Sequence, residues 1–219
     1  MPDGPDAYDA WSERHGGLDP RASGWVRGWI GLTDGVAAPL ARWGVPADAV
    51  TVAGLAVTAV APLLARRPGA GPWLVVPTAI VAGVLDGVDG AVASRAGSSG
   101  RRGQVLDAAT DRVSDVLLAA VPVALGAPRS LGVGLAVVGL AQEGLRVGRG
   151  SLTVTVSERP TRVSVACTAA ALAAFRPARR RSLATAVAAG GLGLGLVGLG
   201  QLVAARRAPR SPGSPPSRG

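Results

Sequence analysis

The feature that most constrains the fold of this chain is a series of six long apolar runs. Each is close to the roughly 20 residues that an α-helix needs to cross the ~30 Å hydrocarbon core of a bilayer. The runs occupy residues 49–65, 72–93, 105–126, 130–148, 161–176 and 183–205, and the first and fifth are the shortest. The sequence therefore predicts an all-α integral membrane protein with six transmembrane helices.

The composition agrees with a membrane protein. Hydrophobic residues make up 48% of the 219 residues and charged residues 17%, which is little charge for an ordinary soluble domain. All 23 basic residues are arginines, and the net charge is +9. Because the arginines lie between the apolar runs rather than along one face, they favour anionic membrane lipids over nucleic acid as partner. The single Cys167 excludes an internal disulfide.

The segment before the first run has a different pattern. Residues 1–20 are polar and acidic, without the basic and apolar regions of a secretory signal. The following stretch places six apolar residues at helical spacing on one face: Trp25, Trp29, Leu32, Val36, Leu40 and Trp43. This pattern predicts an amphipathic helix lying at the membrane interface, with a soluble helix as the alternative. The chain is thus divided into a polar segment (1–20), a membrane domain (21–205) and a disordered basic tail (206–219).

The distribution of arginines predicts the orientation. If the N-terminus is cytoplasmic, six spans place most arginines on the cytoplasmic side, as the positive-inside rule requires. We therefore expect both termini in the cytoplasm and a location in the plasma membrane. The RPARRR cluster at residues 176–181 opposes this orientation, since it falls on the outer side.

Four aspartates gather where two of the apolar runs meet the cytoplasmic side. Asp86 and Asp89 lie near the end of the second run, and Asp107 and Asp111 near the start of the third. Residues three or four apart share a helix face, so two facing helices can present all four carboxylates to one point. Carboxylates at membrane depth are costly and repel one another unless a cation lies among them. Oxygen ligands suit hard cations, which predicts Mg²⁺, Mn²⁺ or Ca²⁺.

The stretch DGVDGAVASRAGSSGRRGQVLDAATD resembles the signature of the CDP-alcohol phosphotransferase family, D-x₂-D-G-x₂-A-R-x₈-G-x₃-D-x₃-D. The residues in register are Asp86, Asp89, Gly90, Ala93, Gly103, Asp107 and Asp111. Ser94 stands in place of the family's arginine. Either Arg95 or Arg101/Arg102 compensates for it, or the enzyme is weakened, or its substrate differs. The upstream segment ADAVT is similar to a Pro-Asn-x-x-Thr pattern of the family, with Asp48 in the Asn place and Thr51 kept.

The resemblance implies an enzyme of phospholipid biosynthesis that works as a homodimer. Such enzymes transfer a phosphatidyl group from a CDP-alcohol, usually CDP-diacylglycerol, to an alcohol and release CMP. It implies Mg²⁺ or Mn²⁺ held by Asp86, Asp89, Asp107 and Asp111, with Asp111 as general base. It further implies a nucleotide site formed by Thr51, Gly90, Ala93 and Gly103. The chemistry is consistent, because a cation neutralises the diphosphate and a carboxylate takes the proton of the alcohol.

A second polar cluster follows the fourth run. Its members are Gln142, Glu143, Arg146, Arg149, Glu158, Arg159 and Arg162. Its arginines could bind an anionic acceptor, in which case Arg146, Arg159 and Arg162 are the candidates; they could equally anchor the chain at the cytoplasmic surface. The ERPTR segment is similar to the Glu-Arg-Pro-x-Arg of actinobacterial phosphatidylinositol-phosphate synthases. Asp115, one turn after Asp111, is predicted to support the site or to pair with a basic residue such as Arg112.

Two other functions fit parts of the sequence. An intramembrane prenyltransferase also uses aspartates and Mg²⁺ on a lipid diphosphate, although two separated aspartate motifs would be expected. A divalent-cation carrier, or a relative without activity, would also gather carboxylates in a membrane, but at mid-depth on several helices. The single compact motif near one membrane face favours the phosphatidyl transferase.

Overall fold

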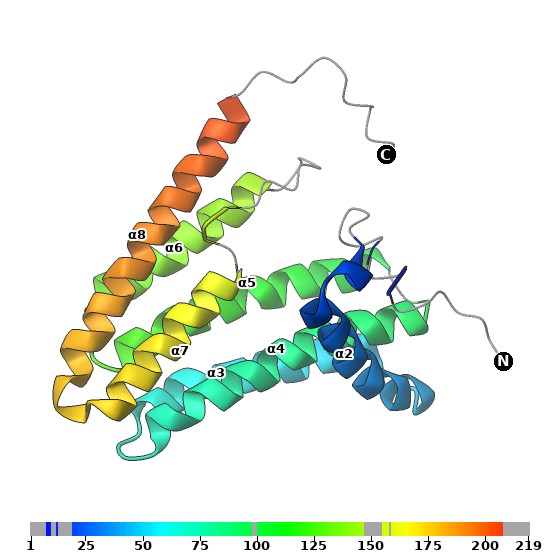
Figure 1. The fold of residues 1–219 in the computed structure, drawn as a ribbon, viewed down its shortest axis with the longest axis horizontal. Helices are drawn as coiled ribbons and strands as arrows, with labels where there is room; N and C mark the ends of the chain where they lie inside the picture. Colours follow the sequence, from blue (N-terminus) through cyan, green and yellow to red (C-terminus); the bar gives the residue numbers. More distant parts are fainter. Residues whose placement is uncertain are drawn as a thin grey trace. The chain divides into compact units, whose positions relative to one another are not determined.

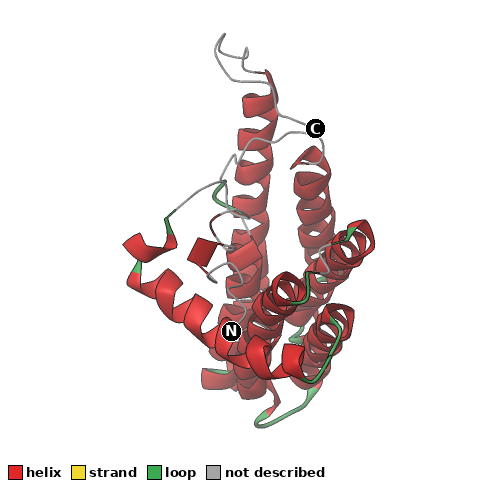
Figure 2. Cartoon of the chain, turned by 90° about the vertical axis from the view of Figure 1, so that its right-hand side faces the viewer, coloured by secondary structure: helices red, strands yellow, loops and turns green. Residues whose placement is uncertain are grey.

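The computed structural model describes residues 8–9, 12, 19–97, 100–146, 155–157 and 159–207. Every regular element in these ranges is a helix (Figures 1 and 2), which confirms the predicted all-α class. Most of the polar segment 1–20, nearly all of the basic tail, Arg149 and Glu158 lie outside the described residues.

Each of the six apolar runs forms one helix, preceded by a helix over the tryptophan-rich segment. The elements are η1 Pro20–Ala22, α2 Gly24–Arg42, α3 Ala47–Arg66, α4 Gly71–Arg95, α5 Arg101–Ala124, α6 Arg129–Arg146, α7 Arg159–Phe175, η2 Pro177–Arg179 and α8 Arg180–Arg207. Several helices begin or end at arginines, since these residues flank the apolar runs. The hydropathy pattern therefore located the helices to within a few residues.

Three stretches of the described chain are long and apolar enough to cross a membrane. These are α3, α4 and the continuous segment Pro177–Arg207 that contains α8. The remaining helices do not meet the length and apolar character of a membrane span. The 17 residues of α7 span about 26 Å at 1.5 Å per residue, and α5 carries the charged residues of the aspartate motif. The chain is a membrane protein, and the six helices formed by the apolar runs include these three candidate spans.

The chain divides into two compact units, and unit 1 comprises Met1–Val60 and Pro77–Ser114. Its core brings together Ala37 of α2, Val50 of α3, and Val88 and Val92 of α4. Helix α2 starts at Ser23, whose hydroxyl accepts a hydrogen bond from the Val26 N–H. It ends before Gly44, whose φ of 71° is a conformation that favours glycine. Unit 1 therefore contains the tryptophan-rich helix and the whole aspartate motif.

Helix α2 buries a different face from the one that the tryptophans mark. Its buried residues are Ile30, Thr33 and Ala37. Trp25 and Trp43 are 79% and 77% exposed, and Leu32 and Val36 are also exposed. The helix thus packs mainly through Ile30, Thr33 and Ala37 and leaves Trp25, Trp43, Leu32 and Val36 on the surface.

Helices α2 and α4 approach each other closely at Gly87. A Cβ atom placed there would lie 2.7 Å from Thr33 Cγ2 and 3.3 Å from Trp29 Nε1. We expect Gly87→Ala to force the two helices apart and to lower the free energy of unfolding by about 1–3 kcal/mol. Thermal unfolding in detergent measures this change.

Gly83, one turn earlier in α4, is the matched control. A Cβ atom there meets nothing within 4 Å, so Gly83→Ala should raise stability by about 0.5–1 kcal/mol through the better helix propensity of alanine. Equal effects of the two substitutions would contradict the close contact at Gly87.

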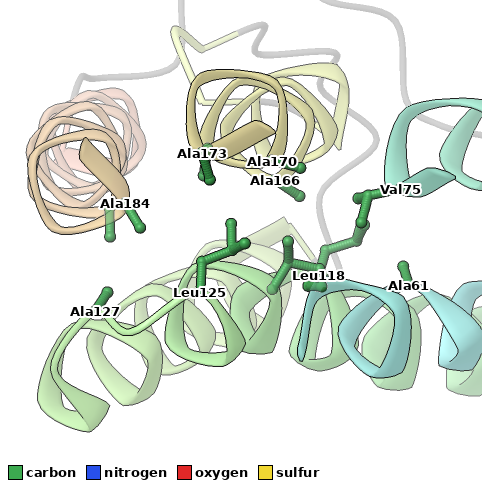
Figure 3. Packing of buried hydrophobic residues seen from close by; sticks show 13 residues of the cluster. Ala61, Val75, Leu118, Leu125, Ala127, Ala166, Ala170, Ala173 and Ala184 are labelled. Carbon is green, nitrogen blue, oxygen red and sulfur yellow. The ribbon is translucent and has the colours of Figure 1, made fainter. Parts of the chain in front are cut away.

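Unit 2 comprises Ala61–Val76 and Asp115–Gly219. Alanines dominate its core (Figure 3): Ala61, Ala65, Ala127, Ala166, Ala169, Ala170, Ala173, Ala184 and Ala188 are buried together with Val75, Leu118, Val121 and Leu125. Helix α8 packs along α6 and α7 (Figure 1). At the contact with α6, the Gln142 side-chain amide donates a 2.7 Å hydrogen bond to the Gly195 carbonyl. Small side chains let helix backbones approach closely, as is common in membrane proteins.

Candidate active site

Three carboxylates of unit 1 converge. Asp86 on α4, and Asp107 and Asp111 on α5, each offer an oxygen within 4.8 Å of the other two. Asp107 and Asp111 lie one turn apart on the same face of α5. Asp86 and Asp111 are half-buried and Asp107 is exposed. Three negative groups at this spacing repel one another unless a cation lies among them, and oxygen donors of this kind fit a hard divalent cation.

The fourth aspartate of the motif lies beside this cluster and is held by α3. Asp89 is buried, and one of its carboxylate oxygens accepts a 2.6 Å hydrogen bond from the Thr51 hydroxyl. The other oxygen accepts from the Gly90 N–H, also at 2.6 Å. Its charge interacts with those of Asp86 and Asp107. Thr51, selected from the sequence for the nucleotide site, thus orients an aspartate of the motif.

The small residues of the motif lie on the same two helices. Gly90 and Ala93 are half-buried on α4, and Gly103 is in the first turn of α5. A Cβ atom at Gly103 would lie 3.8 Å from an Asp48 carboxylate oxygen, which is an ordinary contact. Gly103 therefore faces the start of α3, where Asp48 and Thr51 both lie.

Ser94 and Arg95 have defined partners within unit 1. The Ser94 hydroxyl donates to the Gly90 carbonyl at 3.0 Å. The Arg95 guanidinium binds both carboxylate oxygens of Asp34 on α2, at 2.8 and 2.7 Å. Arg95 is therefore engaged in joining α4 to α2, a partnership that sequence reasoning missed. The signal available was Asp34 itself, a charge within the apolar pattern of α2.

The arginine cluster after α6 belongs to unit 2. Arg162 of α7 forms ion pairs with Asp115 of α5 at 3.0 Å and with Glu143 of α6 at 2.8 Å. Arg146 pairs with the same Glu143 at 3.0 Å and also donates to the Thr155 hydroxyl. Arg159 begins α7 and is half-buried. The structure thus brings Arg146 and Arg162 together on one carboxylate.

Asp115, for which the sequence suggested a basic partner such as Arg112, has Arg162 as a partner. The Asp115 side chain is 6% exposed and that of Arg162 13% exposed. This buried pair joins α5 to α7 directly after the aspartate motif. Because the two residues are far apart in the sequence, no local spacing pointed to it.

Comparisons with known proteins agree with these observations. Residues 45–197 match the family model of CDP-alcohol phosphatidyltransferases, and no curated protein sequence matches the chain significantly. Among solved structures, the fold is similar to the crystal structure of Mycobacterium tuberculosis phosphatidylinositol phosphate synthase (PgsA1) in complex with manganese and citrate. The TM-score is 0.56 with 22% sequence identity, over 78% of this chain and 88% of that chain.

The family model covers well over half of the chain and includes all four aspartates of the motif. Enzymes of this family use divalent cations, and the three converging carboxylates are suited to hold one. The resemblance noted from the motif is thereby confirmed. The chain belongs to the CDP-alcohol phosphatidyltransferase family and is a transferase of substituted phosphate groups.

Proposed function

We propose that the protein transfers a phosphatidyl group from CDP-diacylglycerol to an alcohol acceptor and releases CMP. The observation that carries this proposal is the cluster of Asp86, Asp107 and Asp111, whose carboxylate oxygens lie within 4.8 Å of one another inside the family motif. A site of acidic oxygen ligands at the end of an apolar helix suits a donor with a charged diphosphate head and lipid tails.

Asp86, Asp89, Asp107 and Asp111 would hold Mg²⁺ or Mn²⁺, and the cation would neutralise charge on the diphosphate and on the leaving CMP. The acceptor hydroxyl oxygen attacks the phosphorus that carries the lipid. A new phosphorus–oxygen bond forms there, the bond to the CMP oxygen breaks, and the hydroxyl proton passes to Asp111 as general base. Thr51 fixes Asp89 through its hydroxyl. Gly90, Ala93 and Gly103 leave room for the cytidine nucleotide.

The acceptor in this proposal is an anionic alcohol such as inositol phosphate or glycerol phosphate. Arg146, Arg159 and Arg162 supply positive charge at the adjoining ends of α6 and α7. Arg146 and Arg162 bind Glu143, and Arg159 is the half-buried first residue of α7. The similar mycobacterial structure is that of a phosphatidylinositol phosphate synthase, which supports an acceptor of this class.

The setting we propose is a homodimer in the plasma membrane, with six transmembrane helices in residues 21–205 and the active site at the cytoplasmic side. Helix α2 lies in the interface, where its exposed Trp25 and Trp43 reach headgroup depth. The predicted cytoplasmic termini follow from the arginines that flank the helices.

Incubation of the purified protein in detergent with CDP-diacylglycerol, a divalent cation and a panel of acceptors tests this function. We expect CMP release and a new phospholipid in mass spectrometry with an anionic acceptor, and neither product in excess chelator. Release of inorganic diphosphate from a prenyl diphosphate would indicate a prenyltransferase instead. Cation transport into liposomes without CMP release would indicate a carrier.

Arg159→Ala tests the acceptor site. If Arg159 contacts the anionic group, its loss should raise the KM for the acceptor about tenfold or more, since a charged hydrogen bond contributes about 1.5–3 kcal/mol. The KM for the CDP-linked donor should change little. Arg129→Ala, at the exposed first residue of α6, is the control for loss of one arginine. Equal increases of both KM values in Arg159→Ala would assign the residue to folding or anchoring.

A further inference from the structure

The junction between α7 and α8 carries four arginines in the sequence RPARRR: Arg176, Arg179, Arg180 and Arg181. The orientation proposed above puts this junction on the outer side, where the positive-inside rule gives no reason for such a cluster. The cluster therefore calls for a local explanation in unit 2.

Arg180 has a structural role. Its guanidinium donates to the carbonyls of Ala65 and Ala124, which lie at the C-terminal ends of α3 and α5. Carbonyls at a helix end have no partner within their own helix, and a cation there also suits the helix dipole. Arg180 thus caps two helices of unit 2 at once.

The other three arginines form no capping hydrogen bond of this kind in the described part of the chain. Arg176, Arg179 and Arg181 are exposed, and none of them forms an ion pair with another residue in the described part of the chain. Two of them, Arg179 and Arg181, line an open groove along the first turns of α8.

The residues that line the groove change from basic to polar to apolar along α8. Beyond Arg179 and Arg181 it is lined by Ser182 and Thr185, and then by Ala186 and Ala189. The two hydroxyls donate to the carbonyls of Arg179 and Arg181, at 2.9 and 2.8 Å. The positive charge of the groove therefore comes from the two guanidinium groups and from the N-terminal end of α8. The far end is apolar and lies on a segment that is long and apolar enough to span a membrane.

An aromatic pair indicates the depth of this junction in the membrane. Trp73 and Phe175 contact each other edge to face, with ring centroids 4.4 Å apart. They are 44% and 67% exposed, and Phe175 directly precedes Arg176. Tryptophan is enriched at the level of the lipid headgroups, so Trp73 indicates that depth. The arginines next to this pair are therefore within reach of lipid phosphates.

We propose that the groove formed by Arg179, Arg181 and the first turns of α8 binds an anionic phospholipid. The headgroup phosphate lies between the two guanidinium groups, and an acyl chain follows Ala186 and Ala189. A lipid is favoured over a soluble phosphate because the groove continues from a basic end to an apolar one along a membrane-spanning segment. This binding site is separate from the transfer reaction and does not depend on it.

Native mass spectrometry of the full-length protein in detergent, titrated with phosphatidylglycerol, tests the proposal. We expect Arg179→Gln/Arg181→Gln to weaken phosphatidylglycerol binding about tenfold or more, from the loss of two basic residues at the membrane surface. The matched control is Arg66→Gln/Arg67→Gln, which removes the same charge at the exposed junction of α3 and α4. The control should weaken binding less than about threefold.

Three further arms make the result decisive. Phosphatidylcholine should bind more weakly than phosphatidylglycerol to the wild type, and millimolar inorganic phosphate should not displace the lipid. Arg179→Lys/Arg181→Lys keeps the charge and should bind phosphatidylglycerol nearly as the wild type does. This variant still tests the role of the positive charge if the glutamine variant unfolds. Equal weakening in the two glutamine variants, loss of binding in the lysine variant, or displacement by inorganic phosphate would overturn the proposal.

Discussion

Asp111→Asn should lower kcat by about 10²–10⁴, the range typical for loss of a general base. The carboxamide cannot take the proton of the acceptor hydroxyl, yet it keeps the shape of the side chain. Binding of the CDP-linked donor should largely survive, because Asp86, Asp89 and Asp107 remain to hold a cation. Steady-state kinetics of CMP release, with the donor KM measured separately, checks both parts.

The matched comparisons are Asp107→Asn and Asp9→Asn. Asp107 shares the cluster but is assigned to the cation rather than to the proton, so its loss should strongly lower kcat and also raise the Mg²⁺ concentration needed for the remaining activity. Asp9 is an exposed carboxylate outside the motif, and its substitution should leave kcat unchanged. An Asp111→Asn enzyme with the wild-type kcat would remove Asp111 from the reaction.

Arg162→Met should lower the free energy of unfolding by about 3–5 kcal/mol, because it removes the cation that binds the buried carboxylate of Asp115. Glu143 keeps its ion pair with Arg146. Asp115 and Glu143, which both bind this guanidinium, have side chains 6% and 16% exposed. Chemical or thermal unfolding in detergent measures the loss. Arg21→Met is the control: its ion pair with Asp9 is exposed on both sides, and such pairs contribute about 0–1 kcal/mol.

A double variant separates the ion pair from the volume of the arginine side chain. Asp115→Leu removes the buried charge that Arg162→Met leaves behind, so the double variant should be more stable than Arg162→Met alone. Additive losses would mean that the pair contributes nothing beyond packing. The experiment also separates a structural role of Arg162 from acceptor binding, which would change the acceptor KM and leave stability unaffected.

The positions of the helices could be predicted from the sequence because the apolar runs and the arginines between them mark where each helix begins and ends. The convergence of Asp86, Asp107 and Asp111 could be predicted because the motif has fixed spacing on two consecutive helices. The pairs Asp34–Arg95 and Asp115–Arg162 could not be predicted. Their residues lie on helices that are distant in the sequence, and no pattern along the chain tells which helices become neighbours.

The orientation of α2 illustrates a second limit. Its apolar periodicity identified a face with Trp25 and Trp43, and these side chains are exposed. In a soluble protein an apolar face predicts the buried side of a helix, but in a membrane protein the same face can contact lipid. The packing face of α2 contains Ile30, Thr33 and Ala37, which also follow helical spacing but include only one large apolar side chain. Periodicity therefore predicted the helix without predicting what it packs against.

In the alanine core of unit 2, substitutions that enlarge a side chain should destabilise the protein more than substitutions that shorten it. Ala166, Ala170, Ala184 and Ala188 are fully buried between helices that approach closely because the side chains are small. Shortening such a side chain to glycine removes one methyl group and leaves a small void. Enlarging it to valine or leucine adds volume where the helices are already in close contact, so neighbouring side chains or whole helices have to move. Natural variation at these positions should therefore be confined to Ala, Gly and Ser, even though any apolar residue would satisfy the hydropathy of the segment.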